Sequence, residues 1–340
     1  MKQHSLIFLL ILIIITSCKK DKDLEGINFR SEMVKFTGEI SSYSESLKPG
    51  FIIIPQNGEA LAKENSYLDY VDAVGIEDIS YGYDGDGIAT SSDLKSERLT
   101  YLNMFKALSK PVLITDYVFS NSENIPHFDD ATKNKIDIAY QYSIQNEFIP
   151  YTTVRNLNYL TVNPGHEPAV DTITNFSQAK SFLYYLQPDG ISKEEYIDAI
   201  SKTNFDVVIM DMTYDGSDEW TADDIKKIKQ GLNNGNGGYV VCYMSIGEAE
   251  DYRYYFKKEW TNPNLFDDGS STTGKAPSWM EPENKDWPGN FKVRYWDKEW
   301  KNIILGSSDS YLDKIISKGF DGVYLDIIDA YEYFEEKANR

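Results

Sequence analysis

Short apolar runs alternate with longer amphipathic segments along most of this chain. Apolar residues recur at helical spacing around residues 30–47, 101–108, 130–145 and 300–315, which predicts helices there. Brief apolar runs between such segments are typical of buried parallel strands. They predict eight strands, at residues 51–54, 71–77, 112–116, 148–151, 182–186, 207–211, 239–243 and in the run that ends at Asp326.

This alternation predicts an α/β fold, specifically a (β/α)8 TIM barrel in a single domain over residues 27–340. Parallel strands need crossover helices, and eight of them can close without an exposed edge. A doubly wound open sheet is the alternative architecture, and the length would also fit two domains.

The order of the elements predicts a circularly permuted barrel. The globular part begins with a helix that has no strand before it, and it ends with a strand that has little helix after it. We therefore expect the last strand to lie beside the strand at 51–54, and the first helix to pack where the helix after Asp326 belongs.

Carboxylates follow five of the predicted strands, namely Glu77, Asp116, Asp211, Glu248 and Asp326. The carboxyl ends of barrel strands form the face where active sites are built. Carboxylates held close together there can differ in pKa, so that one is protonated while the other is ionised, as glycoside hydrolysis requires.

Strand parity favours Asp326 and Glu77 as the pair, because their strands would flank the strand at 51–54. Asp211 satisfies the same parity and remains a competitor, and Asp326 by itself would also suit a turn cap. Asp211, Glu248, Gln56, Asn57, Asp116 and Tyr331 are further candidates for binding substrate hydroxyl or amino groups, since they lie at or shortly after strand ends.

Five of the six tryptophans lie in or just after a long loop expected over residues 254–294, namely Trp260, Trp279, Trp287, Trp296 and Trp300. Their flat faces would suit stacking on sugar rings at the barrel mouth. For each tryptophan the alternative is packing that holds the loop down, and the helical spacing of Trp300 favours the core.

The N-terminus predicts an exported lipoprotein. Residues 1–17 combine a basic start with an apolar run at 6–15, as in a signal peptide, and Thr16-Ser17-Cys18 resembles a bacterial lipobox in which Cys18 receives lipid. Residues 18–26 would be a flexible tether, so membrane contact is expected through the lipid anchor alone, at the outer membrane or cell surface. A plain signal peptide is the alternative. Cys242 lies in an apolar run, so no internal disulfide is expected.

The formal net charge of −20 disfavours nucleic acid as a partner and favours a cationic or neutral ligand, although acidity also serves solubility. The sequence has three histidines and no P-loop, Rossmann or GxSxG motif. We therefore expect neither a metal site nor a cofactor.

Five segments resemble glycoside hydrolase family 114, which is built on endo-α-1,4-polygalactosaminidases: residues 182–187, 245–253, 287–290, 293–297 and 319–334. Residues 51–58, 74–82 and 111–117 also look like motifs of that family, so the resemblance covers nearly all of the mature chain. The order is permuted relative to that family, with residues 155–178 as the linker that joins the family's two ends. The resemblance implies that Asp326 is the nucleophile, that Glu77 is the general acid/base, and that the substrate is a cationic α-1,4-linked galactosamine polymer. A non-catalytic glycan-binding lipoprotein and a hydrolase of another polysaccharide are the alternatives.

Overall fold

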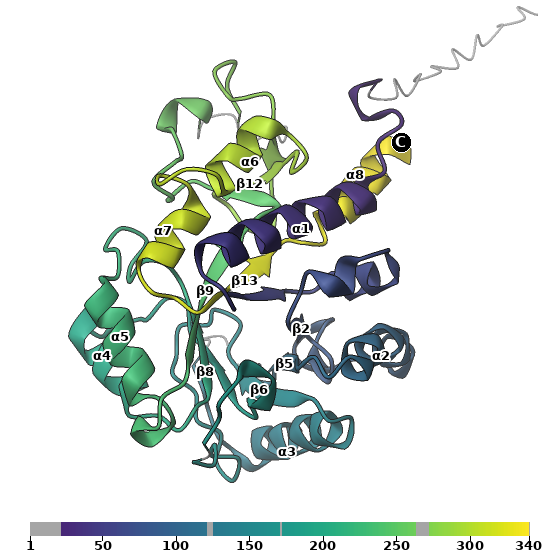
Figure 1. The fold of residues 1–340 in the computed structure, drawn as a ribbon. Coiled ribbons are helices and arrows are strands. Elements are labelled where there is room, and N and C mark those ends of the chain that lie inside the picture. The colour runs from purple at the N-terminus through teal and green to yellow at the C-terminus, as the bar shows by residue number, and fades with distance from the viewer. Residues whose placement is uncertain (1–21, 121–124, 171, 263–271, 340) are drawn as a thin grey trace, which may run out of the picture.

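Two parallel sheets form the centre of the molecule (Figure 1). The computed structural model describes residues 22–120, 125–170, 172–262 and 272–339. The larger sheet has the strand order β1 (Ile52–Pro55), β13 (Gly322–Asp326), β9 (Tyr239–Ser245), β8 (Val207–Met210) and β7 (Phe182–Tyr184). The smaller sheet has the order β2 (Val74–Glu77), β5 (Val112–Tyr117) and β6 (Ile149–Thr153). Every neighbouring pair within these two sheets is parallel.

The two sheets meet at both of their edges. Gln56, just after β1, forms a parallel bridge with Gly75 of β2. On the other side, the ring of Tyr151 in β6 packs 5.4 Å from the ring of Phe182 in β7, with no ladder between these strands in the residues described. The fold is therefore mixed α/β with parallel sheets, and its strand order is compatible with a TIM-type fold.

The first and last strands lie side by side, as the sequence predicted. β1 pairs with β13 in the register Ile52↔Gly322 to Pro55↔Leu325. Helix α1 (Phe29–Leu47) packs beside helix α8 (Ala330–Asn339), and Arg30 forms an ion pair with Glu335. The prediction of little helix after Asp326 was wrong, because α8 follows it and is anchored to α1 by this ion pair and by the stacked rings of Phe29 and Phe334.

The remaining helices begin where the sequence supplies a cap. Ser192 with Glu195 and Thr221 with Asp224 both form full capping boxes, which fix the starts of α4 (Lys193–Ser201) and α5 (Ala222–Gly231). The other α-helices are α2 (Ser92–Ala107), α3 (Asp130–Gln145), α6 (Lys298–Ile304) and α7 (Tyr311–Ser317).

The β2 strand is shorter than the predicted 71–77, because the side chain of Asp72 binds the backbone of β1 in place of a regular strand-to-strand hydrogen bond. Its carboxylate accepts a hydrogen bond from the backbone N–H of Ile53 at 2.8 Å, and its own N–H donates to the Ile53 carbonyl. The chain therefore joins the regular sheet at Val74.

The segment predicted as a long loop over 254–294 contains strands. β11 (Met280–Glu283) and β12 (Asn290–Val293) form an antiparallel sheet with β10 (Glu248–Glu250), and the short η6 (Lys258–Trp260) precedes them. Glu248 therefore lies on a strand of its own and not at the end of β9. A second hairpin, β3 (Tyr81–Gly82) with β4 (Gly85–Ala89), follows β2.

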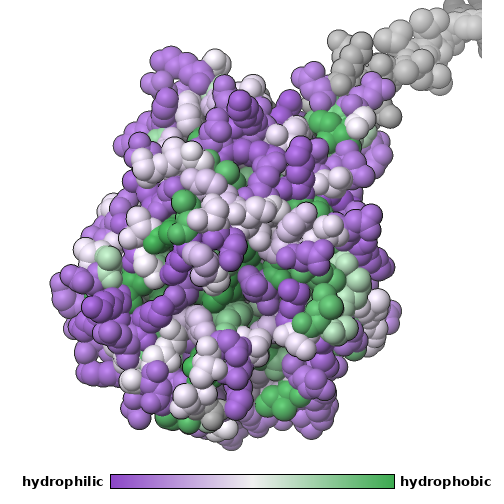
Figure 2. Space-filling view, viewed as in Figure 1, coloured by the Kyte–Doolittle hydropathy of each residue, from purple (hydrophilic) through white to green (hydrophobic). Residues whose placement is uncertain are grey.

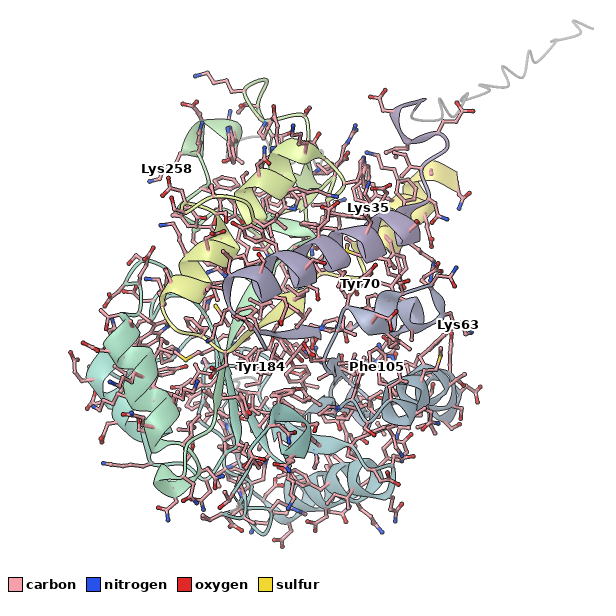
Figure 3. The ribbon with its side chains drawn as sticks, viewed as in Figure 1. Lys35, Lys63, Tyr70, Phe105, Tyr184 and Lys258 are labelled. Carbon is pink, nitrogen blue, oxygen red and sulfur yellow. The ribbon has the colours of Figure 1, made fainter. Side chains whose placement is uncertain are left out.

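The hydrophobic core fills the space between the sheets and their helices. Phe105 and Tyr184 point into it, whereas Lys35, Lys63 and Lys258 lie at the surface (Figure 3). Hydrophilic residues cover most of the face seen in Figure 2. Within the described ranges, no helix combines the length and apolar character needed to cross a membrane.

The start of the globular part differs from the predicted tether. Residues 22–24 form a short 3-10 helix, and the side chain of Leu24 is buried in the main core. The signal segment 1–17 and Cys18 lie outside the described residues.

Candidate active site

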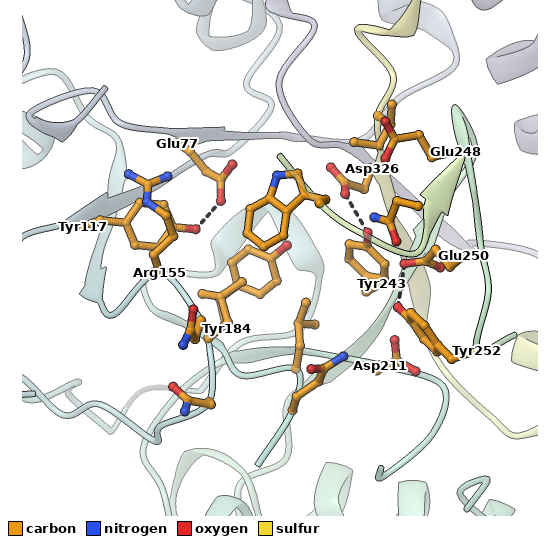
Figure 4. A pocket seen from close by; sticks show the side chains of 18 of the residues that line it. Glu77, Tyr117, Arg155, Tyr184, Asp211, Tyr243, Glu248, Glu250, Tyr252 and Asp326 are labelled. Atoms are coloured by element: carbon orange, nitrogen blue, oxygen red, sulfur yellow. Dashed lines mark hydrogen bonds between the residues drawn. The ribbon is translucent and has the colours of Figure 1, made fainter. Parts of the chain in front are cut away.

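A cavity of about 740 Å³ opens at the carboxyl ends of the central strands (Figure 4). Six of the residues that the sequence singled out line it, namely Asn57, Glu77, Asp211, Glu248, Trp287 and Asp326. This volume lies within the roughly 300–1,000 Å³ range of small-molecule pockets. The structure therefore brings together both members of the predicted catalytic pair.

Glu77 ends β2 and is held by two donors. The hydroxyl of Tyr117, at the end of β5, donates a short hydrogen bond to Glu77 Oε1. Asn57 Nδ2 donates to Glu77 Oε2 at 3.4 Å, and Asn57 Oδ1 accepts from the Glu77 N–H at 3.2 Å. Asn57 has a φ of 59°, a left-handed conformation that asparagine tolerates well. The turn after β1 thus fixes the Glu77 carboxylate in the cavity wall.

Asp326 ends β13 and accepts a hydrogen bond at Oδ2 from the hydroxyl of Tyr243, at 2.6 Å (Figure 4). Burial raises the pKa of Asp326 well above its usual range, and the charge of Glu77 raises it further, whereas the Tyr243 hydrogen bond lowers it. The charge of Glu77 therefore acts on the protonation of Asp326.

The backbone directly after Asp326 is strained. Ile327 has a φ of 56°, which is rare for a β-branched residue. The Ile327 carbonyl and side chain lie so close to Gly247 that a Cβ at that glycine would overlap them. Ile246 N–H donates to the Asp326 carbonyl at 3.0 Å. The Ile246-Gly247 turn after β9 therefore supports the conformation that directs Asp326 into the cavity.

Two buried tyrosines lie near both carboxylates. The rings of Tyr184 and Tyr324 meet edge to face, 5.2 Å apart. Burial raises the pKa of each hydroxyl well above its ordinary value, and the charges of Glu77 and Asp326 add to this for both tyrosines. Gly75 is required beside Tyr324, because a Cβ there would overlap its hydroxyl. Tyr184 lines the cavity, and Tyr324 packs against its ring.

Asp211 belongs to a buried ion network. Arg253 donates Nη1 to Asp211 Oδ1 at 2.8 Å and Nη2 to Oδ2 at 2.7 Å, and its Nε donates to Glu250 Oε2 at 2.6 Å. The Tyr252 hydroxyl donates to the other Glu250 oxygen at 2.6 Å (Figure 4). Both oxygens of Asp211 therefore accept hydrogen bonds from Arg253, while the residue also lines the cavity.

Glu248 is fully buried in the cavity wall. Its Oε1 accepts from Asn284 Nδ2 at 2.9 Å and from Lys292 Nζ at 3.1 Å, while Oε2 has no partner among the described residues. Asp329 also lines the cavity, and burial together with the nearby Glu332 raises its pKa to about 7. This part of the wall presents acceptors to a ligand.

Three predicted substrate-binding residues do not line the cavity. Asp116 Oδ1 accepts from the backbone N–H groups of Ser80 and Tyr81 at 2.5 and 2.9 Å, so it holds the loop after β2. Gln56 accepts from the hydroxyl of Tyr324. Tyr331 is buried, with the guanidinium of Arg30 4.3 Å from its ring centroid. All three stabilise elements around the site without reaching it.

Sequence reasoning missed the tyrosines that bind the two acids and the cation beside them. The guanidinium of Arg155 lies 4.1 Å from the ring centroid of Tyr117 and pairs with Asp78 and Asp86 at 3.1 and 2.6 Å. Arg155 begins the segment that the sequence suggested was a linker, where the apolar pattern weakens. Tyr117 and Tyr243 could have been predicted from the sequence, because each lies at or near the end of a strand, as the predicted acids do.

The fold and the site together define a mixed α/β protein with paired carboxylates in a cavity at its strand ends. The model of glycoside-hydrolase family GH114 matches residues 166–340, about half of the chain. The chain belongs to this family. The matched segment contains Asp326 and excludes Glu77.

Relatives in distant organisms each match between two fifths and half of the chain. An uncharacterized protein of Methanocaldococcus jannaschii is 38% identical over 171 residues, which is 49% of this chain and 43% of that protein. An uncharacterized protein of Thermotoga maritima is 38% identical over 142 residues, covering 41% of this chain and 37% of the relative. One of Deinococcus radiodurans is 36% identical over 141 residues, covering 42% and 39%. The chain thus spans about two fifths of the length of these curated relatives.

Proposed function

We propose that this protein is a glycoside hydrolase in which Asp326 is the nucleophile and Glu77 is the general acid/base. The observation that carries the proposal is their shared cavity: the acids end the two strands on either side of β1, and each accepts a hydrogen bond from a tyrosine. Paired carboxylates flanking the scissile bond are the usual equipment of glycosidases.

In the first step, Glu77 protonates the glycosidic oxygen while Asp326 attacks the anomeric carbon and forms a glycosyl ester. Glu77 then removes a proton from water, and the resulting nucleophile displaces Asp326 and regenerates the free enzyme. Two inversions give a product of retained configuration. Tyr243 restricts the rotation of the Asp326 carboxylate through its bond to Oδ2.

The cycle needs Asp326 ionised while Glu77 carries the proton. Burial and the charge of Glu77 raise the pKa of Asp326, whereas the hydrogen bond from Tyr243 lowers it. When the proton lies on Glu77, its charge no longer opposes ionisation of Asp326, and the Tyr243 hydrogen bond stabilises the anion. This is the protonation state that the first step of the proposed cycle requires.

The proposed substrate is an α-1,4-linked, galactosamine-containing polysaccharide that is cut within the chain. Support comes from the acidic lining of the cavity, because Asp211 and Glu250 share the single cation of Arg253, and Asp326 and Asp329 add two further carboxyl groups. A net charge of −20 attracts a partly deacetylated, cationic polymer over a longer range.

Incubation with acetylated and deacetylated α-1,4-polygalactosamine tests this substrate, with a neutral α-1,4-glucan as control. We expect new reducing ends from the galactosamine polymers and none from the glucan, and an early fall in mean chain length if cleavage is internal. Release of reducing ends from the glucan alone would show that the substrate is a different polysaccharide.

We also propose the permuted order and the lipid anchor. The family match begins at residue 166, inside the segment 155–178 that would join the family's two ends, and β1 and β2 complete the site from outside the matched range. The lipobox-like residues before Cys18 support acylation there and attachment to the outer membrane or cell surface.

A further inference from the structure

We propose that the hairpin between β11 and β12 forms a second sugar-binding subsite, in which Trp287 stacks on a pyranose ring next to the unit cleaved by Asp326. This subsite, which we call the lip subsite, consists of Trp287, Pro288, Asn290, Glu248 and Asp329, all of which line the cavity. It rests on the proposed glycosidase function and adds to it a site outside the catalytic pair.

Trp287 differs from the other tryptophans in its exposure. Trp220, Trp260, Trp279 and Trp300 are buried, and Trp296 is half-buried between Phe29 and Phe334. Trp287 is 52% exposed, and in the described part of the chain no ring or cation stacks on it. A large apolar ring left open beside a cavity is therefore available to a ligand.

The hairpin holds Trp287 in place before any ligand arrives. The Trp287 N–H donates to the Asn284 carbonyl at 3.2 Å, and the Asn290 N–H donates to the Trp287 carbonyl at 3.1 Å. Gly289 N–H donates to Glu283 Oε1 at 2.7 Å, and its carbonyl accepts from the Asp251 N–H at 2.9 Å. Because these bonds fix the backbone that carries the Trp287 ring, the hairpin loses little conformational entropy when a sugar binds.

Glycine is needed at position 289. Its φ of +94° favours glycine, and a Cβ there would lie 3.0 Å from a carboxylate oxygen of Asp251. The turn that presents Trp287 therefore depends on this residue.

The polar side of the lip subsite is made of acceptors. Glu248 is fully buried, and Oε2 has no partner among the described residues although Oε1 has two. A buried acceptor without a partner is costly, so a ligand that donates to it gains a strong interaction. Asp329 adds a second carboxyl group to the lining of the same cavity. The sugar ring bound here must carry hydroxyl or ammonium groups that donate hydrogen bonds. The face of the Trp287 ring provides its apolar contact.

Calorimetric binding of galactosamine and of fully deacetylated α-1,4-galactosamine oligosaccharides, up to the hexamer, tests the lip subsite. The Asp326→Asn background prevents turnover. We expect Trp287→Ala to weaken hexamer binding about tenfold, which corresponds to roughly 1.4 kcal/mol, while binding of the monosaccharide stays the same. Trp287→Phe should restore most of the loss, and Glu248→Gln should also weaken hexamer binding.

Tyr83→Ala is the matched control, because Tyr83 is an aromatic residue of similar exposure, 56%, that does not line the cavity. Hexamer affinity that is unchanged in Trp287→Ala would overturn the lip subsite and leave the proposed function standing. If oligosaccharide binding depends on Trp287 but the parent protein, with Asp326 intact, cleaves none of the polymers, the proposed function would be overturned and the lip subsite would stand. Absence of binding at every chain length would overturn both.

Discussion

The hydroxyl of Tyr243 donates to Asp326 Oδ2 at 2.6 Å, and this bond opposes the two influences that raise the pKa of Asp326. Burial and the charge of Glu77 both raise the pKa of Asp326. The tyrosine therefore determines how much of the nucleophile is ionised at a given pH.

Replacement of this tyrosine by phenylalanine should shift the pH dependence of hydrolysis. Loss of the Tyr243 hydrogen bond raises the pKa of Asp326, so the acid limb of kcat/KM should move to higher pH in Tyr243→Phe. A hydrogen bond to a charged group contributes about 1.5–3 kcal/mol, so activity on the acid side should fall by about 10- to 100-fold. The measurement is a pH–rate profile.

Tyr295→Phe is the control for that profile. The Tyr295 hydroxyl is buried and donates to the Phe29 carbonyl at 2.8 Å, and Tyr295 is not among the residues that line the cavity. We expect lower stability and an unchanged acid limb. An equal shift in both variants would show that the effect is general and not specific to Asp326.

The buried Asp116 should make the protein less stable as the pH rises. Burial raises its pKa to about 7, so the folded state binds a proton there that the unfolded chain releases near pH 4. The contribution of Asp116 to the free energy of unfolding is fully present below about pH 4 and is lost between about pH 4 and pH 7. The loss is about 1.4 kcal/mol for each unit by which the pKa is raised. Urea denaturation at several pH values should show this slope, and Asp116→Asn should reduce it. An unchanged slope in the variant would contradict the assignment.

Arg253 should be needed for stability because it neutralises two buried carboxylates, those of Asp211 and Glu250. Removal of one partner from a buried ion network typically costs about 3–5 kcal/mol. We expect Arg253→Met to lower Tm strongly, and Arg253→Lys to recover part of the loss at most, since lysine cannot form the bidentate contact. Lys292→Met serves as a comparison, because Lys292 is more exposed and pairs with Glu248 alone at the cavity. Equal losses in the two methionine variants would contradict a special role for Arg253.

Cys18 should attach the mature protein to membranes. In a bacterial host, Cys18→Ala should move the protein from the membrane fraction to the soluble fraction, and incorporation of labelled palmitate should disappear. Ser17→Ala keeps a small residue before the cysteine and should leave both unchanged. Membrane association that persists in Cys18→Ala would exclude the lipid anchor.

The sequence predicted the parallel strands well because each is a short apolar run that ends at a turn or a polar residue. The neighbouring position of β1 and β13 could also be predicted, since an unpaired helix at one end and a strand at the other leave few ways to cover the sheet. Asp326 and Glu77 were found because both close such a run.

The partners of the carboxylates could not be predicted in the same way. Whether Asp211 is free or bound to Arg253 depends on a contact across 42 residues of chain. Asp116 follows an apolar run just as Asp326 does, yet the backbone of the loop after β2 occupies its carboxylate. Strand-end position therefore identifies the acids near a site, and the three-dimensional contacts decide which of them remain open to a ligand.

Azide rescue of the two acid variants tests the proposed roles most directly. On an activated α-linked galactosaminide, Asp326→Asn with azide should give the glycosyl azide of inverted configuration, because azide replaces the missing nucleophile. Glu77→Gln should give the azide of retained configuration, because azide attacks the ester already formed on Asp326. The opposite pair of products would show that Asp326 is the general acid/base and Glu77 the nucleophile. If both variants, in the absence of azide, hydrolysed the substrate as fast as the parent protein, the proposed roles would be contradicted.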